Sequence, residues 1–174
     1  MGVAPDLGFR LICTMATRIL IDGYNFLWQD RLFRDEAIRG HDKGRTAVLE
    51  WLAKRPQLKE FDVSVVFDAY KTDASRPTES VDRGFRVVFT ASGQRADDWI
   101  KAAASQWGPA AIVVSSDIEV MRHAEKKGCG VLSSKEFQIA VDRPETFEAD
   151  PSRRFGRAKR RALARLTKNP DDGE

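Results

Sequence analysis

The chain has 174 residues, the length of one compact domain with a short extension. Hydrophobic residues make up 42% of it and charged residues 32%, which excludes a disordered chain, and no run of about 18 apolar residues exists that would cross a membrane. Its two cysteines, Cys13 and Cys129, are too few for a disulfide framework, and no Cys/His cluster has zinc-ligand spacing. We therefore expect a reducing, cytoplasmic setting.

Charge is divided unevenly along the chain. Residues 151–174 contain eight basic and three acidic residues, a net charge of +5, whereas residues 1–150 contain 21 basic and 23 acidic residues, a net charge of −2. A dense run of Lys and Arg is typical of segments that contact phosphate backbones, and it includes Arg154, Arg157 and Arg161. A solvated terminal helix explains the run equally well. A membrane surface fits less well, because the apolar face of such a helix is small.

Residues 1–14 precede a second methionine, Met15, and contain only a short apolar patch. They lack the long apolar region of a secretory signal. We expect this segment to be a disordered extension or the product of a start site assigned too far upstream.

Strands and helices alternate along the rest of the chain. Short apolar runs indicate buried strands at residues 18–22, 62–68, 85–89, 110–114 and 130–132. Apolar residues at helical spacing predict helices at residues 43–54, 95–107, 116–127 and 134–141, with a further short helix at 26–33. Ser133 or Ser134 caps the last of these helices, and the polar stretch 71–84 is predicted to be a loop.

The predicted strands consist almost entirely of Val, Ile and Leu rather than alternating apolar and polar residues. This pattern is typical of a parallel sheet covered by helices on both faces, so it predicts an α/β fold. It does not define the strand order. A sheet of this kind binds its ligand beyond the carboxyl ends of its strands.

Acidic residues stand at four points where such a sheet would present its carboxyl edge. Asp22 and Asp68 end the first two strands. Asp97 and Asp98 open the helix after the third strand, and Asp117 follows the fourth. Carboxylates that converge in a small volume repel one another, and a hard cation such as Mg²⁺ or Mn²⁺ offsets that repulsion. Such a cation lowers the pKa of a bound water and shields phosphate charge, which favours metal-assisted phosphodiester chemistry.

Each of these acids also has a purely structural interpretation. Asp22 and Asp68 could form turns, and the acids at 97 and 98 could be ordinary first-turn residues favoured by the helix dipole. Asp117 or Ser116 could be a helix cap. The recurrence of an acid at all four strand exits favours a shared site over four separate structural roles.

Other polar and aromatic side chains flank these acids. Asn25 could orient a water or a carboxylate, or cap a helix, and Arg45 on the first long helix could face a phosphate or solvent. Ser115 and Ser116 offer hydroxyl and N–H groups that could cradle a phosphate. Of the four tryptophans, Trp28 is the best candidate for stacking on a nucleobase.

Several segments together resemble the NYN branch of the PIN-like nucleases, in particular the YacP-like NYN ribonucleases of bacteria. The segments are ILIDGYN at 19–25, VVFDAY at 65–70, VVFT at 87–90, GQRADDWI at 93–100 and VVSSD at 113–117. The resemblance covers roughly residues 18–140. It implies a three-layer PIN-like α/β sandwich with a central, mainly parallel sheet at residues 15–150, followed by a basic helical tail at 151–174.

The resemblance also implies roles for individual residues. Asp22, Asp97 and Asp117 match the acids that would hold the metal, and Asp68 matches a further acid of the same site. Asp98 is an additional acid beside this set. Arg45 matches a basic residue on the first long helix of the family. Bacterial members of this type are associated with ribosome-linked mRNA cleavage.

Three hypotheses follow. The first is an endoribonuclease that uses Mg²⁺ or Mn²⁺ and cleaves single-stranded or looped RNA, with mRNA on the ribosome as the implied target. The second is a non-catalytic module of the same fold that binds RNA or the ribosome, which the basic tail motivates. The third is a Rossmann-like phosphatase, but Tyr24 stands where such an enzyme carries a second aspartate.

Overall fold

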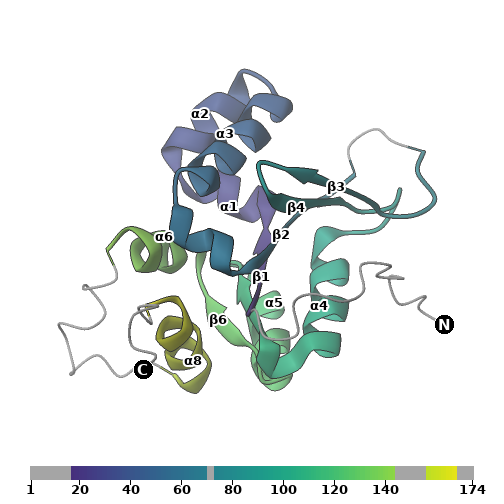
Figure 1. Cartoon of the computed structure of the whole chain (residues 1–174). Coiled ribbons are helices and arrows are strands. Elements are labelled where there is room, and N and C mark those ends of the chain that lie inside the picture. The colour runs from purple at the N-terminus through teal and green to yellow at the C-terminus, as the bar shows by residue number, and fades with distance from the viewer. Residues whose placement is uncertain (1–16, 70–72, 144–155, 168–174) are drawn as a thin grey trace.

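A six-stranded sheet forms the centre of the protein (Figure 1), whose computed structural model describes residues 17–69, 73–143 and 156–167. The strands lie in the order β3-β4-β2-β1-β5-β6. β3 pairs antiparallel with β4, and every other neighbouring pair is parallel. The strands are β1 (Arg18–Asp22), β2 (Asp62–Phe67), β3 (Thr78–Asp82), β4 (Phe85–Phe89), β5 (Ala111–Val114) and β6 (Gly130–Leu132). The extension predicted at residues 1–14 lies outside the described residues.

Helices lie between most of the strands in the chain, although β2, β3 and β4 follow one another directly. They are α1 (Gly23–Gln29), α2 (Arg31–Ile38), α3 (His41–Ala53), α4 (Ala96–Trp107), α5 (Ile118–Lys126), α6 (Ser134–Asp142) and α8 (Arg157–Leu166), with 3₁₀ helices η1 (Pro56–Glu60) and η2 (Gly108–Ala110). No helix in the described part of the chain is both long and apolar enough to span a lipid bilayer.

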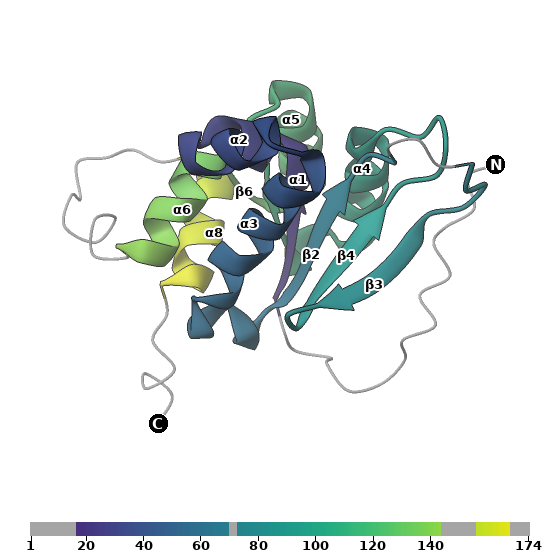
Figure 2. The same cartoon turned by 90° about the horizontal axis from the view of Figure 1, so that it is seen from above.

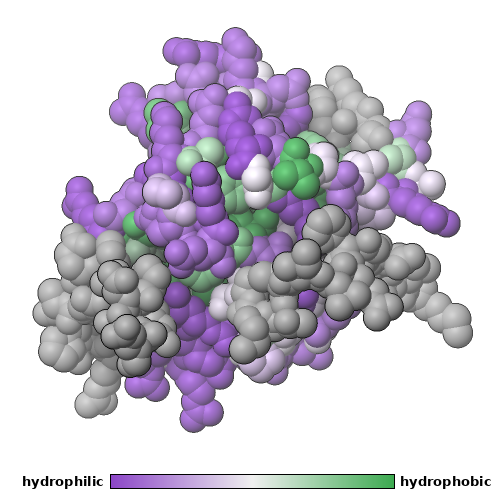
Figure 3. Space-filling view, viewed as in Figure 1, coloured by the Kyte–Doolittle hydropathy of each residue, from purple (hydrophilic) through white to green (hydrophobic). Residues whose placement is uncertain are grey.

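Helices cover both faces of the sheet (Figure 2). Ile21 and Val65 point to the face covered by α1, α2, α3 and α6, whereas Leu20 and Val66 point to the face covered by α4 and α5. Successive strand residues point to opposite faces, so strands buried on both sides must be apolar throughout. The outer surface is mainly hydrophilic in the view of Figure 3. The predicted α/β sandwich with a central, mainly parallel sheet is confirmed.

The stretch 71–84, predicted to be a loop, contains strand β3, so this prediction is wrong over Thr78–Asp82. β3 joins β4 through a tight turn at Arg83 and Gly84, whose φ angles are both positive, 51° and 87°. β3 is an outer strand that is exposed along most of its length. It therefore lacks the apolar run by which a buried strand is recognised in a sequence.

The helix predicted at residues 26–33 is two helices, α1 and α2. Asp30 separates them in an extended conformation, with ψ of 132°. Its side chain accepts a hydrogen bond of 2.8 Å from the N–H of Leu32 and so caps the start of α2. Phe26 of α1 and Phe33 of α2 stack across the junction with their ring centroids 5.6 Å apart. Both helices therefore bury one aromatic residue on the same side, although the backbone breaks between them.

The basic helical tail expected at residues 151–174 contains helix α8, which packs against the rest of the protein. Ala158, Ala162 and Leu163 are buried, and the helix packs against β6 and α6. Lys159 forms an ion pair with Glu136 of α6. Ala162 has only a methyl side chain, which lets the helix approach Gly130 closely.

We expect the substitution Gly130→Ala to weaken the contact between α8 and the sheet. A Cβ atom at residue 130 would lie 2.9 Å from the Cβ of Ala162 and 3.0 Å from its Cα and N atoms. Since backbone atoms cannot move aside alone, the expected loss is about 1–3 kcal/mol of unfolding free energy, measured by urea denaturation. Gly156→Ala is the control, because its Cβ would meet no atom within 4 Å. Equal stability of both variants would contradict the described packing.

Candidate active site

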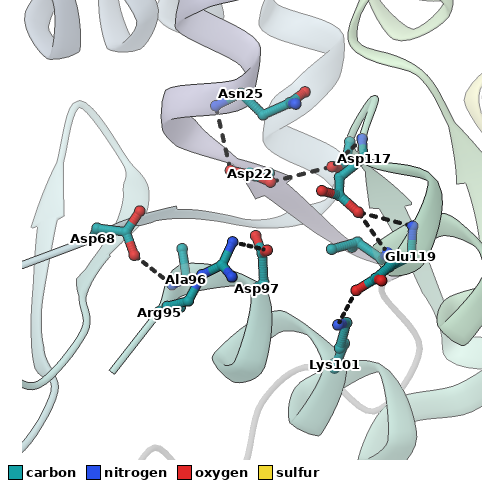
Figure 4. Close-up of polar contacts among 11 residues, drawn as sticks. Asp22, Asn25, Asp68, Arg95, Ala96, Asp97, Lys101, Asp117 and Glu119 are labelled. Atoms are coloured by element: carbon teal, nitrogen blue, oxygen red, sulfur yellow. Dashed lines mark hydrogen bonds and ion pairs between the residues drawn. The ribbon is translucent and has the colours of Figure 1, made fainter. Parts of the chain in front are cut away.

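Four acids from separate segments meet at the carboxyl edge of the sheet. Asp22 ends β1, Asp68 follows β2, and Asp117 follows β5. Asp97 lies in the first turn of α4, whose start is carried to the same edge by β4. Figure 4 shows the carboxylates of Asp22, Asp97 and Asp117 turned toward a common space, with Asp68 to one side. We call these four residues the carboxylate cluster.

Asp22 is the buried member of the cluster, with 5% of its surface exposed. Its Oδ1 accepts a hydrogen bond of 3.3 Å from the backbone N–H of Asn25, in the first turn of α1, and so caps that helix. Its Oδ2 accepts one of 3.1 Å from the hydroxyl of Ser115. The pKa of Asp22 is raised to about 6, chiefly by burial; the nearby charges of Asp97 and Asp68 contribute to the rise, and these two hydrogen bonds oppose it.

Asp97 is electrostatically coupled to the rest of the cluster. Burial raises the pKa of its carboxyl group, and the charges of Asp117 and Asp68 add to that effect. Arg95, whose guanidinium lies 2.8 Å from the Asp97 carboxylate, acts in the opposite direction. The pKa values of Asp22 and Asp97 are thus both raised, and the charges of Asp68 and Asp117 contribute to these rises, as expected for acids that share one small volume.

Asp68 and Asp117 also begin helices. Asp68 Oδ1 accepts a hydrogen bond of 2.6 Å from the N–H of Ala96, the first residue of α4. Asp117 Oδ1 accepts bonds of 2.8 Å and 3.1 Å from the N–H groups of Glu119 and Val120 at the start of α5. Asp117, rather than Ser116, is therefore the N-cap of α5. The structural and the shared-site interpretations are compatible, because a carboxylate that caps a helix through one oxygen still has a second oxygen.

Asn25 ties together three segments that surround the cluster. Its side-chain oxygen accepts a hydrogen bond of 2.8 Å from the N–H of Ser116 and one of 3.1 Å from the hydroxyl of Ser134. Ser133, not Ser134, caps α6, and its capping box includes Glu136. The hydroxyl of Ser134 is thereby left to bind Asn25. The loop after β5, the start of α6 and helix α1 are held in one arrangement.

Replacing Asn25 by alanine is expected to destabilise the fold by about 1–3 kcal/mol, because it leaves the buried hydroxyl of Ser134 and the N–H of Ser116 without their acceptor. Chemical denaturation of the purified variant measures this loss. Gln29→Ala is the matched control, since it removes an exposed amide from the same helix. Similar losses of unfolding free energy in both variants would show that the side-chain oxygen of Asn25 does not stabilise the fold.

The structure also places the residues that were expected to bind RNA. Arg45 donates a hydrogen bond of 2.8 Å to the hydroxyl of Tyr24, pairs with Asp42 and lies over the ring of Phe89. Ser115 is fully buried, so its hydroxyl faces the protein. Ser116 is half-buried, and its N–H is bonded to Asn25. The guanidinium of Arg45 is thus already engaged within the protein, and so are the Ser115 hydroxyl and the Ser116 N–H.

The remaining candidates lie apart from the cluster or are committed elsewhere. Asp98 is exposed and is not among the charges that raise the pKa of Asp22 or Asp97. Arg157 is exposed at the start of α8. Arg161, on the same helix, donates a hydrogen bond of 3.3 Å to the carbonyl oxygen of Cys129. Arg154 lies outside the described residues.

Sequence reasoning missed three residues that support the cluster. Ser134 holds Asn25, and Arg95 pairs with Asp97. Thr90 accepts a hydrogen bond of 3.0 Å from the N–H of Ala69 and donates one of 2.7 Å to the carbonyl of Gln94. These bonds join the segment after β2, which carries Asp68, to the loop that precedes α4. Thr90 follows β4 directly, so its place at a strand exit was a signal that could have been used.

The donor set of the cluster suits a hard divalent cation. Carboxylate oxygens are the ligands that Mg²⁺ and Mn²⁺ prefer, and a cation would offset the repulsion that raises the pKa of Asp22 and Asp97. In the described part of the chain, hydrogen bonds engage one oxygen each of Asp68, Asp97 and Asp117 and leave the second oxygen of each. No three acidic, His or Cys side chains among the described residues already stand close enough to chelate one ion. Closure around an ion therefore requires side-chain movement.

A mainly parallel sheet whose carboxyl edge gathers acids from four segments is the arrangement of a nuclease-like α/β domain. The family model for the YacP-like NYN domain matches residues 19–169, and the chain belongs to this family. The resemblance found in the sequence motifs is thus confirmed, and the match extends through α8.

Solved structures that resemble the protein include two of one bacterial relative. The crystal structure of Rae1 (YacP) from Bacillus subtilis is 25% identical with a TM-score of 0.56, and the match covers 75% of each chain. The crystal structure of a mutant of Rae1 is 20% identical with a TM-score of 0.58, over 86% of this chain and 91% of that one. No curated protein sequence matches the chain significantly.

Proposed function

We propose that the protein is a metal-dependent endoribonuclease that hydrolyses phosphodiester bonds in single-stranded or looped RNA. The observation that carries this proposal is the carboxylate cluster, in which Asp22 and Asp97 have raised pKa values because they are partly or fully buried next to other acids. Membership of a nuclease-like family supports the same chemistry. Messenger RNA on the ribosome is the setting that the family resemblance favours.

Asp22, Asp97 and Asp117 would hold Mg²⁺ or Mn²⁺, with Asp68 in support. The cation would act as a Lewis acid that makes water a stronger nucleophile near neutral pH and offsets the charge of the phosphate. Ser115 fixes the orientation of the Asp22 carboxylate by donating to its Oδ2. Asn25 fixes the spacing between α1 and the loop that carries Asp117.

Arg95 is a described cation that lies beside the cluster, where it could meet a phosphate. Its side chain is 75% exposed, and its guanidinium now pairs with Asp97 at 2.8 Å. An exposed ion pair of this kind contributes little stability, so Arg95 can exchange its partner at low cost. We propose that it turns to the RNA backbone when Asp97 binds a cation. The exposed Arg157 of α8 supplies a further backbone contact.

The direct test is cleavage of single-stranded and stem-loop RNA by the purified protein with Mn²⁺, Mg²⁺ or EDTA. We expect cleavage only with a metal, and a loss of at least about 100-fold for Asp97→Asn, because even partners outside the metal's own ligands are worth about 10–100-fold. Asp98→Asn, an exposed neighbour on the same helix, is the matched control. Cleavage that is insensitive to EDTA and to Asp97→Asn would refute the assigned site. RNA binding without cleavage would favour the non-catalytic module.

A further inference from the structure

A pocket of about 300 Å³ lies directly beside the carboxylate cluster. Tyr24 and Trp28, one turn apart on α1, line it together with His41 at the start of α3. Asp68 and Ala69, after the end of β2, complete its described walls. Because Asp68 belongs to the carboxylate cluster as well, the pocket opens next to the place where a phosphodiester would be cleaved.

One wall of the pocket is held rigidly. The ring of Tyr24 packs edge-on against Phe67 with centroids 5.2 Å apart, and against His41 with centroids 6.1 Å apart. The Tyr24 hydroxyl accepts a hydrogen bond of 2.8 Å from Arg45, whose guanidinium in turn lies over the ring of Phe89. A wall that is already ordered costs a ligand little conformational entropy on binding.

A second part of the lining is an exposed indole. Trp28 is 42% exposed, whereas Trp99 and Trp107 are 3% and 8% exposed in the core. An indole that faces solvent at the mouth of a pocket presents an apolar, flat surface that a second aromatic ring can cover. Nucleobases stack on such side chains regardless of their identity, because every base has a π-face.

The chemistry of the lining selects a base rather than a phosphate. No Lys or Arg is among the described residues that line the pocket, and the carboxylate of Asp68 would repel an anion there. We propose that this pocket, walled by Tyr24, Trp28 and His41, receives one unpaired nucleobase of the RNA strand whose backbone lies at the carboxylate cluster. The inference rests on the proposed function and predicts a preference for unpaired RNA, since a base in a duplex cannot enter.

The experiment measures binding separately from cleavage. Full-length protein carrying Asp97→Asn, in EDTA, is titrated with a short single-stranded RNA and with copies of it that each lack the base at one position. We expect Trp28→Ala in this background to weaken binding of the intact RNA by about 5- to 150-fold, the equivalent of about 1–3 kcal/mol for one stacked base. Trp28→Phe should restore most of the affinity. Leu32→Ala, which removes an exposed apolar side chain from α2, should have no effect.

The copies that lack one base identify the contact. We expect at least one of these copies to bind the protein that keeps Trp28 as weakly as the intact RNA binds the Trp28→Ala protein. The substitution Trp28→Ala should then cause no further loss of affinity for that copy. The salt dependence of binding should be the same with and without Trp28, because stacking releases no counterions. Equal affinity of the Trp28 and Trp28→Ala proteins for every RNA would overturn the proposal. An affinity loss of the same size on every copy would also overturn it.

The two proposals fail in different ways. If the unsubstituted protein cleaves RNA with Mn²⁺ but Trp28→Ala leaves the binding of all copies unchanged, the pocket is not a base subsite and the nuclease proposal stands. If no metal supports cleavage but one missing base cancels the effect of Trp28→Ala, the base subsite stands in a protein that only binds RNA.

Discussion

The substitution Asp22→Asn is expected to abolish RNA cleavage and, without metal, to make the protein more stable at neutral pH. The pKa of Asp22 is raised to about 6, chiefly by burial, from an ordinary value near 3.8. Ionising the folded protein at this site therefore costs up to about 3 kcal/mol more than ionising the unfolded chain. Asparagine removes that cost, and its side-chain oxygen can still accept from the N–H of Asn25.

The sign of the effect sets its pH dependence. A raised acid pKa contributes stability that is fully present below the pKa of the unfolded chain and is lost as pH rises through about 6. The advantage of Asp22→Asn should therefore be largest above pH 6 and shrink steadily toward pH 4. Urea denaturation in EDTA at several pH values measures it. A variant that is less stable than the parent at neutral pH would contradict the burial argument.

A divalent cation should reverse the comparison. Mg²⁺ or Mn²⁺ is expected to stabilise the parent protein, because a ligand that binds only the folded state adds to its stability, and to leave Asp22→Asn nearly unchanged. Asp98→Asn, with its exposed carboxylate, should behave like the parent with and without metal. A stabilisation by Mg²⁺ that is as large in Asp22→Asn as in the parent would exclude Asp22 as a ligand.

Gly23→Ala is expected to destabilise the protein and to reduce cleavage together. A Cβ atom at residue 23 would lie 2.4 Å and 2.5 Å from ring atoms of Phe67 and 2.8 Å from the carbonyl oxygen of Val66. The ring is fully buried and the carbonyl belongs to β2, so neither can yield freely. Helix α1 must move away from β2, at a cost of about 1–3 kcal/mol.

Moving α1 also moves the cluster, since Asp22 caps this helix and Asn25 lies on it. A misplacement of about 1 Å in an active site can cost about 100-fold in rate, so we expect a fall in activity of that order. Gly130→Ala is the matched comparison, because it crowds the sheet at β6 without touching α1. Both variants should lose stability, and only Gly23→Ala should lose cleavage at a temperature where both are folded. An equal loss of activity would reduce the role of Gly23 to stability.

The buried strands were predictable because they obey one simple rule. Ile19 to Ile21 and Val63 to Phe67 are covered on both faces, so apolar residues fill every position and the run stands out in the sequence. β3 does not follow this rule, because its residues Thr78–Asp82 are mostly exposed and form a strand by pairing with β4. The strand order likewise depends on contacts between distant segments, which no local pattern encodes.

The acids of the site were predictable for a topological reason, but the groups that hold them were not. Parallel strands bring their carboxyl ends to one edge, so Asp22, Asp68 and Asp117 could be placed there in advance. Asn25 and Ser134 are 109 residues apart, and nothing at either position announces their hydrogen bond. The tie between Asp22 and Ser115 spans 93 residues in the same way.

The two borders of the sheet are closed by different means. Along β6, helix α8 contributes Ala158 to the packing on one face and Leu163 to that on the other, so it straddles the border. Along β3, charged residues such as Glu79 and a sharply turned hairpin discourage an incoming strand. A shortened protein lacking α8 would leave the main-chain N–H and C=O groups of β6 open to pairing with another copy. We therefore expect a protein shortened in this way to self-associate more readily than the full chain.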